Sequence, residues 1–197
     1  MKKATTFLSM IALCMVLGAC GSDNKESNGD SSSVEPSQVE SSEESIASDV
    51  PVSEIKQAVV DALGENYWPQ MEIPAEILEG TYGVKADMYD EVLAEMPMMM
   101  TNVDTLIVVK AKEDKVEEVE AALNAYREIL VNDTMQYPMN LGKIQASRIE
   151  VIGNYVCFVQ LGADTMAALE KGDEAVIKQC LEQNELAIEV IRNTVVK

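Results

Sequence analysis

Histidine is absent from this chain of 197 residues, and its absence narrows the possible chemistry. Without imidazole the chain cannot form a Ser-His-Asp or Cys-His catalytic site, and the usual histidine-containing zinc and iron sites are excluded as well. The phosphate-binding patterns GxxxxGK[ST] and GxGxxG are missing, and so is the D-x-[DN]-x-[DN]-G loop of calcium sites. The sequence therefore assigns no catalytic residue and no metal ligand, and we expect no cofactor.

Basic side chains are also scarce, with 15 Lys and Arg against 34 Asp and Glu. Nucleic acids and anionic lipid headgroups are bound by clusters of Lys and Arg, so we expect no nucleic-acid partner. The chain also has no apolar run of the ~20 residues that a membrane-spanning helix needs. Any association with a membrane must therefore arise in another way.

The N-terminus has the pattern of a secretory signal, which we predict over residues 1–19. Lys2 and Lys3 precede an apolar stretch of about residues 7–17, which ends in the sequence LGAC. A basic start followed by an apolar segment of this length is typical of an export signal. The LGAC sequence resembles the bacterial lipobox, whose cysteine receives a diacylglyceryl group and becomes the new N-terminus. An ordinary secretory signal cut nearby, or an uncut anchor, is the alternative.

The lipobox resemblance implies that Cys20 is the lipid attachment site. One acyl chain binds a bilayer only marginally, whereas two or three hold firmly, so the protein would be anchored in the cell membrane and exposed on its outer side. Residues 20–51 are rich in Ser, Glu, Asp and Gly and cannot bury enough apolar surface to fold, so we predict a disordered tether. Residues 52–197 have the length of a single domain.

Hydrophobic periodicity and turn residues predict eight elements in this domain. Gly153-Asn154 is the signal of a two-residue hairpin, and Pro97 indicates an edge or a bulge in its strand. The predicted helices cover residues 53–63, 74–80, 114–131 and 173–195, and the predicted strands cover residues 90–99, 105–112, 144–152 and 155–162. This order predicts an α+β fold in which a four-stranded, mainly antiparallel sheet forms a ββαββα core with the helices packed on one face.

Several short sequences in this region resemble a family of domains of unknown function carried on lipoproteins of Gram-positive anaerobic bacteria. The shared features are Val109-Lys110, Tyr126-Arg127-Glu128, Tyr137-Pro138 and Gly153-Asn154-Tyr155. The resemblance covers about residues 53–197. It implies a location and a fold, and it implies no activity.

Two clusters could carry chemistry. Tyr67, Trp68 and Tyr82 lie near Pro and Gly, where aromatic residues could stack on a sugar or a peptide, and they form a candidate ligand surface. The chain has one Trp and two Phe, so the alternative, which we favour, is that Trp68 anchors the core. The sequence MPMMM, residues 96–100, contains thioethers that suit Cu(I), and in a strand Met96, Met98 and Met100 would share one face. Filling of an irregular core by flexible methionines is the simpler interpretation, and it is the one we favour.

The sequence leaves open the role of the carboxylate pairs and the pairing of two cysteines. Carboxylate pairs such as Asp87 and Asp90 occur by chance in any acidic protein, although a glycosidase needs only two of them at a set separation. Cys157 and Cys180 lie in apolar sequence and are either buried thiols or a disulfide.

The sequence as a whole favours a lipid-anchored exported domain that acts as a non-catalytic binding or interaction module at the cell surface. Its partner would be an unknown protein or a small molecule. The alternative is a carboxylate-dependent hydrolase of cell-wall or extracellular polysaccharide.

Overall fold

A computed structural model describes residues 49–99 and 101–196 of the chain. The predicted signal, Cys20 and nearly all of the predicted tether lie outside the described residues. No helix within the described ranges is long and apolar enough to cross a membrane.

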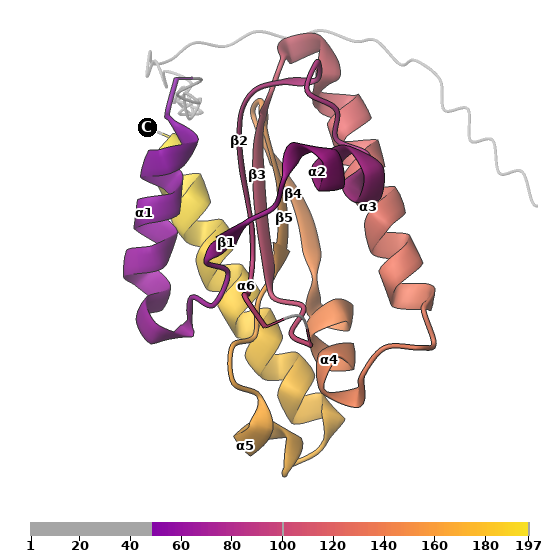
Figure 1. Cartoon of the computed structure of the whole chain (residues 1–197). Helices are drawn as coiled ribbons and strands as arrows, with labels where there is room; N and C mark the ends of the chain where they lie inside the picture. The colour runs from indigo at the N-terminus through magenta and orange to yellow at the C-terminus, as the bar shows by residue number, and fades with distance from the viewer. Residues whose placement is uncertain (1–48, 100, 197) are drawn as a thin grey trace, which may run out of the picture. The chain divides into compact units, whose positions relative to one another are not determined.

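The described chain contains helices and strands in mixed order (Figure 1). The helices are α1 (Val52–Leu63), α2 (Ala75–Tyr82), α3 (Val116–Asn132), α4 (Pro138–Ala146), α5 (Met166–Leu169) and α6 (Asp173–Val195), with short 3-10 turns η1 (Gly64–Asn66) and η2 (Glu113–Lys115). The strands are β1 (Met71–Glu72), β2 (Tyr89–Met96), β3 (Thr105–Ala111), β4 (Arg148–Ile152) and β5 (Tyr155–Gln160). The mixed α and β composition and the antiparallel sheet confirm the expected class.

Within the described residues the sheet has five strands in the order β1-β2-β3-β5-β4, and all neighbouring pairs are antiparallel. The expected number of four was wrong, because the two-residue strand β1 pairs with the end of β2 at Met71 and Met96. The hairpin at Gly153-Asn154 is confirmed, since Ile152 and Tyr155 are register partners and Gly153 has a φ of 60°.

Helices cover both faces of the sheet, so the expectation of one covered face was wrong (Figure 1). On one face α1 and α6 pack on alternate residues of β3 and β5, including Val108 and Cys157. On the other face α2 and α3 pack on the intervening residues, including Val109 and Phe158. All six residues of β5 are buried for this reason, and a strand buried on both sides has a continuous apolar sequence instead of an alternating one.

Helix α4 was not predicted, and the start of the strand predicted over residues 144–152 was wrong. Residues 144–146 belong to α4, and β4 begins only at Arg148. Pro138 occupies the first turn of α4, where its missing N–H costs nothing. The buried side of this helix carries Asn140, Gly142 and Lys143 beside Ile144 and Ala146, so it has no apolar stripe for sequence analysis to detect.

Candidate functional site

A cavity of about 190 Å³ lies where four distant segments of the described chain meet. These segments are the connection after η1, the β2–β3 loop, helix α4 and the β5–α5 loop. The residues that line the cavity are Trp68, Met99, Thr101, Asn102, Met139, Asn140, Lys143, Ala163, Asp164, Thr165 and Met166. Its wall is mostly apolar with a few polar groups, which is the usual character of a small-molecule site.

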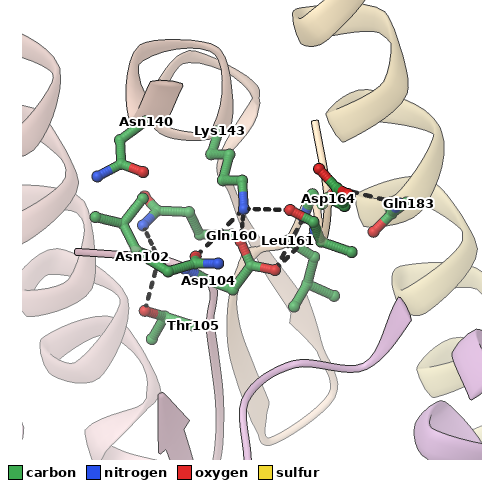
Figure 2. A network of polar contacts seen from close by, with 12 residues as sticks. Asn102, Asp104, Thr105, Asn140, Lys143, Gln160, Leu161, Asp164 and Gln183 are labelled. Carbon is green, nitrogen blue, oxygen red and sulfur yellow. Dashed lines mark hydrogen bonds and ion pairs between the residues drawn. The ribbon is translucent and has the colours of Figure 1, made fainter. Parts of the chain in front are cut away.

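Lys143 lines this site and lies at the centre of a network of polar contacts (Figure 2). Its side chain is 3% exposed and its Nζ lies 5.3 Å from the centre of the Trp68 ring. The ammonium donates to Asp104 Oδ1 at 2.6 Å, to the Ala163 carbonyl at 2.7 Å and to Asn102 Oδ1 at 3.2 Å. Because an ammonium has three N–H donors, all of them are satisfied within the protein.

Asp104, the partner of Lys143, is completely buried just before β3. Its second oxygen, Oδ2, accepts from the Ala163 N–H at 2.8 Å and from the Gly162 N–H at 3.4 Å. Burial raises the pKa of the Asp104 carboxyl above its ordinary value, while Lys143 and the two amides act in the opposite direction. The pair joins the β2–β3 loop, α4 and the β5–α5 loop into one unit.

The β5–α5 loop is held closely against α6. Ala163 has a φ of 49°, the only positive value for a residue other than glycine in the described part of the chain. Gly162 leaves no room for a side chain, since an added Cβ would lie 2.7 Å from Cys180 Sγ. The Gln179 side chain donates to the carbonyls of Gly162 at 3.0 Å and Asp164 at 2.8 Å. These contacts fix the carbonyl of Ala163 opposite Lys143.

The β2–β3 loop is tied to α4 in a similar way. Asn140 donates from its amide to the Thr101 carbonyl at 2.9 Å, and Asn102 Oδ1 accepts from the Asp104 N–H at 2.8 Å. The base of the cavity is thus pre-organised by hydrogen bonds between segments that are about 40 residues apart in sequence.

Three methionines form the outer wall of the cavity. Met99 follows β2, Met139 lies in α4 and Met166 begins α5. Their exposed fractions are 64%, 45% and 59%, so all three side chains reach solvent. The favoured interpretation, that the MPMMM methionines fill the core, was wrong for Met98 and Met99, which are 78% and 64% exposed. The strand that would have given Met96 and Met98 a shared face ends at Met96, before Pro97. Met100 lies outside the described residues.

The three aromatic residues expected to form a ligand surface are not brought together. Trp68 lines the cavity, but Tyr67 is 5% exposed and belongs to the core between the sheet and the helices α1 and α6. Tyr82 is 6% exposed and lies on the opposite face of the sheet, where its ring centre is 4.3 Å from that of Tyr126. Of the three residues, only Trp68 borders this cavity.

Tyr67 takes part in a separate polar cluster. Its hydroxyl donates to Glu95 Oε2 at 2.6 Å, and Lys56 forms an ion pair with the same carboxylate. Burial is the main cause of a pKa of Tyr67 far above its ordinary value, and the neighbouring Glu95 raises this pKa further. A second, more open cavity of about 280 Å³ is lined by these three residues and by Val60, Gly64, Pro69 and Gln70.

Sequence analysis missed Lys143 and Asp104, the two charged residues at the centre of the site. A single Lys or Asp in a sequence of high charge content carries no signal of burial. Cys157 and Cys180 are both free and buried, in agreement with the buried-thiol alternative. No group of three or more Cys, Asp or Glu residues that could hold a metal ion occurs within 49–99 and 101–196.

Comparison with known proteins identifies a family. The model of DUF4358, a domain of unknown function, matches residues 62–161, and the chain belongs to this family. The match includes Trp68, Met99, Asp104, Met139 and Lys143 and ends before Met166 and α6. No curated protein and no solved structure is significantly similar to the chain.

Proposed function

We propose that this DUF4358 protein is an exported, lipid-anchored protein whose folded domain binds a ligand in the Trp68 cavity and performs no catalysis. The support for export is the N-terminal sequence, in which a basic start and an apolar stretch lead to LGAC. Cys20 would carry the lipid and hold the acidic domain at the outer surface of the cell membrane. The proposal includes a bacterial origin of the kind that the lipobox implies.

The support for a ligand site is the cavity itself. Trp68 supplies a large flat surface, and the methionines supply adaptable apolar contacts. The base of the site is rigid because Lys143 and Asp104 are fully hydrogen-bonded, so binding would cost little ordering of the protein. The observation on which the proposal chiefly rests is this combination of a rigid polar base and an apolar wall that is open to solvent.

A hydrolytic activity has less support. A carboxylate-dependent hydrolase needs two carboxyl groups that face the same substrate. Asp164 is the one acidic residue among the described residues of the cavity wall, and both oxygens of Asp104 are engaged beneath it. Lys143 is equally unavailable as a nucleophile, because its three N–H groups already have acceptors.

Trp68 offers a direct test of ligand binding, because it is the only tryptophan in the chain. A panel of small organic compounds and short peptides should include members that change the Trp68 emission saturably. Met139→Ala should weaken that binding, whereas Gln70→Ala, a change in the second cavity, should leave it unaltered. Binding that responds to Gln70→Ala alone, or no response to any member of a broad panel, would contradict the assignment.

Lipid attachment is tested separately by fractionation of cells. The wild-type protein should appear in the membrane fraction and carry fatty acid at Cys20 by mass spectrometry. Cys20→Ser should lose both properties, and Cys14→Ser, which alters a cysteine within the predicted signal, should lose neither. A wild-type protein with an intact Met1 and an unmodified Cys20 would disprove the anchor.

A further inference from the structure

We infer that the methionine wall of the Trp68 cavity binds Cu(I), an inference that rests on the cavity being a ligand site as proposed above. The donors are the thioethers of Met99, Met139 and Met166. They come from three separate segments of the chain and line one cavity.

The donor chemistry selects a soft ion. Thioether sulfur is a soft ligand that favours Cu(I), whereas Mg²⁺ and Ca²⁺ require several oxygen ligands and Zn²⁺ prefers thiolate, imidazole or carboxylate. Among the described residues of the cavity wall, Asp164 is the one carboxylate, and the chain has no histidine. Hard and borderline cations therefore find few of the charged or imidazole ligands that they prefer here.

The accessibility of the three side chains also favours an ion from solvent. Met99, Met139 and Met166 are 45–64% exposed, although burial would remove their apolar surface from water. A methionine side chain is unbranched and has three rotatable bonds, so each thioether can change its position at the cavity by rotation of the side chain alone.

The ammonium of Lys143 does not prevent cation binding. Its charge is compensated by Asp104, whose Oδ1 lies 2.6 Å from Nζ, and all three of its N–H groups point to acceptors within the protein. The pair as a whole is neutral. The acidic excess of the chain, with a formal net charge of −19, favours the approach of cations.

The test is a Cu(I) competition titration of the full chain, performed without oxygen and with bicinchoninate as the competing chelator. Cys14→Ser and Cys20→Ser are introduced first, because these thiols outside the described residues would themselves bind Cu(I). The protein should retain one equivalent of Cu(I) and none of Zn²⁺. The Trp68 emission should be quenched in proportion to the bound metal.

Matched variants locate the site. Met99→Leu, Met139→Leu and Met166→Leu keep the side-chain volume and remove the sulfur. Each should lower the affinity for Cu(I) at least about tenfold, the loss that results from altering even an outer group of a metal site. Met98→Leu and Met135→Leu, at two exposed methionines that do not line the cavity, should have no effect.

The inference is overturned if the chain retains no Cu(I), or if a triple Leu variant retains it as well as the parent does. In either case a saturable response of Trp68 to an organic ligand would leave the proposed function intact. If both the metal and the organic panel leave the Trp68 emission unchanged, the ligand site and the Cu(I) assignment fail together.

Discussion

At the scale of single residues, the buried Lys143–Asp104 pair is the feature with the greatest consequence. A buried ion pair costs desolvation on both sides and is tolerated only when the remaining hydrogen-bonding groups are satisfied. Here Asn102, Gly162 and Ala163 satisfy them. The pair therefore specifies how three segments meet, more than it adds net stability.

Removal of the lysine charge should be strongly destabilising. Lys143→Met leaves the Asp104 carboxylate buried without its cation, and we expect a loss of about 3–5 kcal/mol in the free energy of unfolding. The double variant Lys143→Met with Asp104→Asn should recover part of this loss, because the asparagine oxygen can still accept from the Ala163 N–H. Urea denaturation measures both. If the free energy of unfolding falls less in Lys143→Met than in the double variant, the pair does not hold these segments together.

Burial of the Cys157 and Cys180 thiols makes the free energy of unfolding depend on pH in the alkaline range. Burial raises the pKa of Cys157 from 9.0 to about 12, so the native state keeps a proton that the unfolded chain loses. The stabilising effect is complete below pH 9.0 and is lost as the pH rises toward 12. Each such group contributes a slope of about 1.4 kcal/mol per pH unit in this range.

Cys157→Ala should therefore make the free energy of unfolding fall less steeply between pH 9.0 and about 12, by the slope of one proton. Urea denaturation at a series of pH values measures the slope. Cys180→Ala is the matched variant, since burial raises the pKa of Cys180 to about 11 and its effect should end at lower pH. Identical slopes for the wild type and Cys157→Ala would contradict the interpretation.

At the scale of elements, close contact between α4 and α6 determines the position of the site. Gly142 allows this contact, because an added Cβ would lie 2.5 Å from Val176 Cγ1. Asn184 of α6 then bridges two backbones, accepting from the Leu161 N–H at 2.8 Å and donating to the Ala146 carbonyl at 2.8 Å. Helix α4 is thus placed by α6 and by the base of the cavity.

Two glycine substitutions separate helix propensity from packing. Alanine is about 1 kcal/mol more favourable than glycine inside a helix. Gly80→Ala in α2 meets no atom within 4 Å and should stabilise the protein by about that amount. Gly142→Ala should instead destabilise it by about 1–3 kcal/mol, because overpacking against Val176 outweighs the propensity gain. Thermal and urea denaturation compare the two, and stabilisation by both variants would disprove the close contact.

At the scale of the whole molecule, charge is the dominant property. A formal net charge of −19 in 197 residues disfavours self-association and repels anionic surfaces, but it also opposes compaction. Ion pairs such as Arg192 with Glu150 offset little of this repulsion, because solvent-exposed pairs contribute only about 0–1 kcal/mol.

Salt should therefore stabilise the protein. Exposed charges farther apart than about 10 Å are largely screened at 0.1 M ionic strength, so added NaCl should raise the unfolding temperature. Circular dichroism during heating measures the effect. The same comparison near pH 4, where about half of the carboxylates carry protons, should show a smaller increase. An unfolding temperature that does not respond to NaCl at neutral pH would show that self-repulsion is negligible.

The sequence by itself determined the elements whose pattern is local. The helix predicted over 53–63 is observed as α1, the helix over 173–195 as α6, and the strand over 105–112 as β3. These three predictions are correct because hydrophobic periodicity and turn residues are properties of neighbouring positions in the chain. Trp68 was recognised as a candidate for the same reason, since a single tryptophan near proline is visible without any fold.

Only the tertiary structure decided which faces are covered, where α4 lies and which side chains meet. The apolar run of β3 predicts a buried strand equally well under one layer of helices or between two. Lys143 and Asp104, like the three methionines of the cavity, are joined across tens of residues by packing and hydrogen bonds that depend on every segment between them. The hydrophobic effect is largely non-directional, so it determines that a residue is buried but does not determine which residue packs beside it.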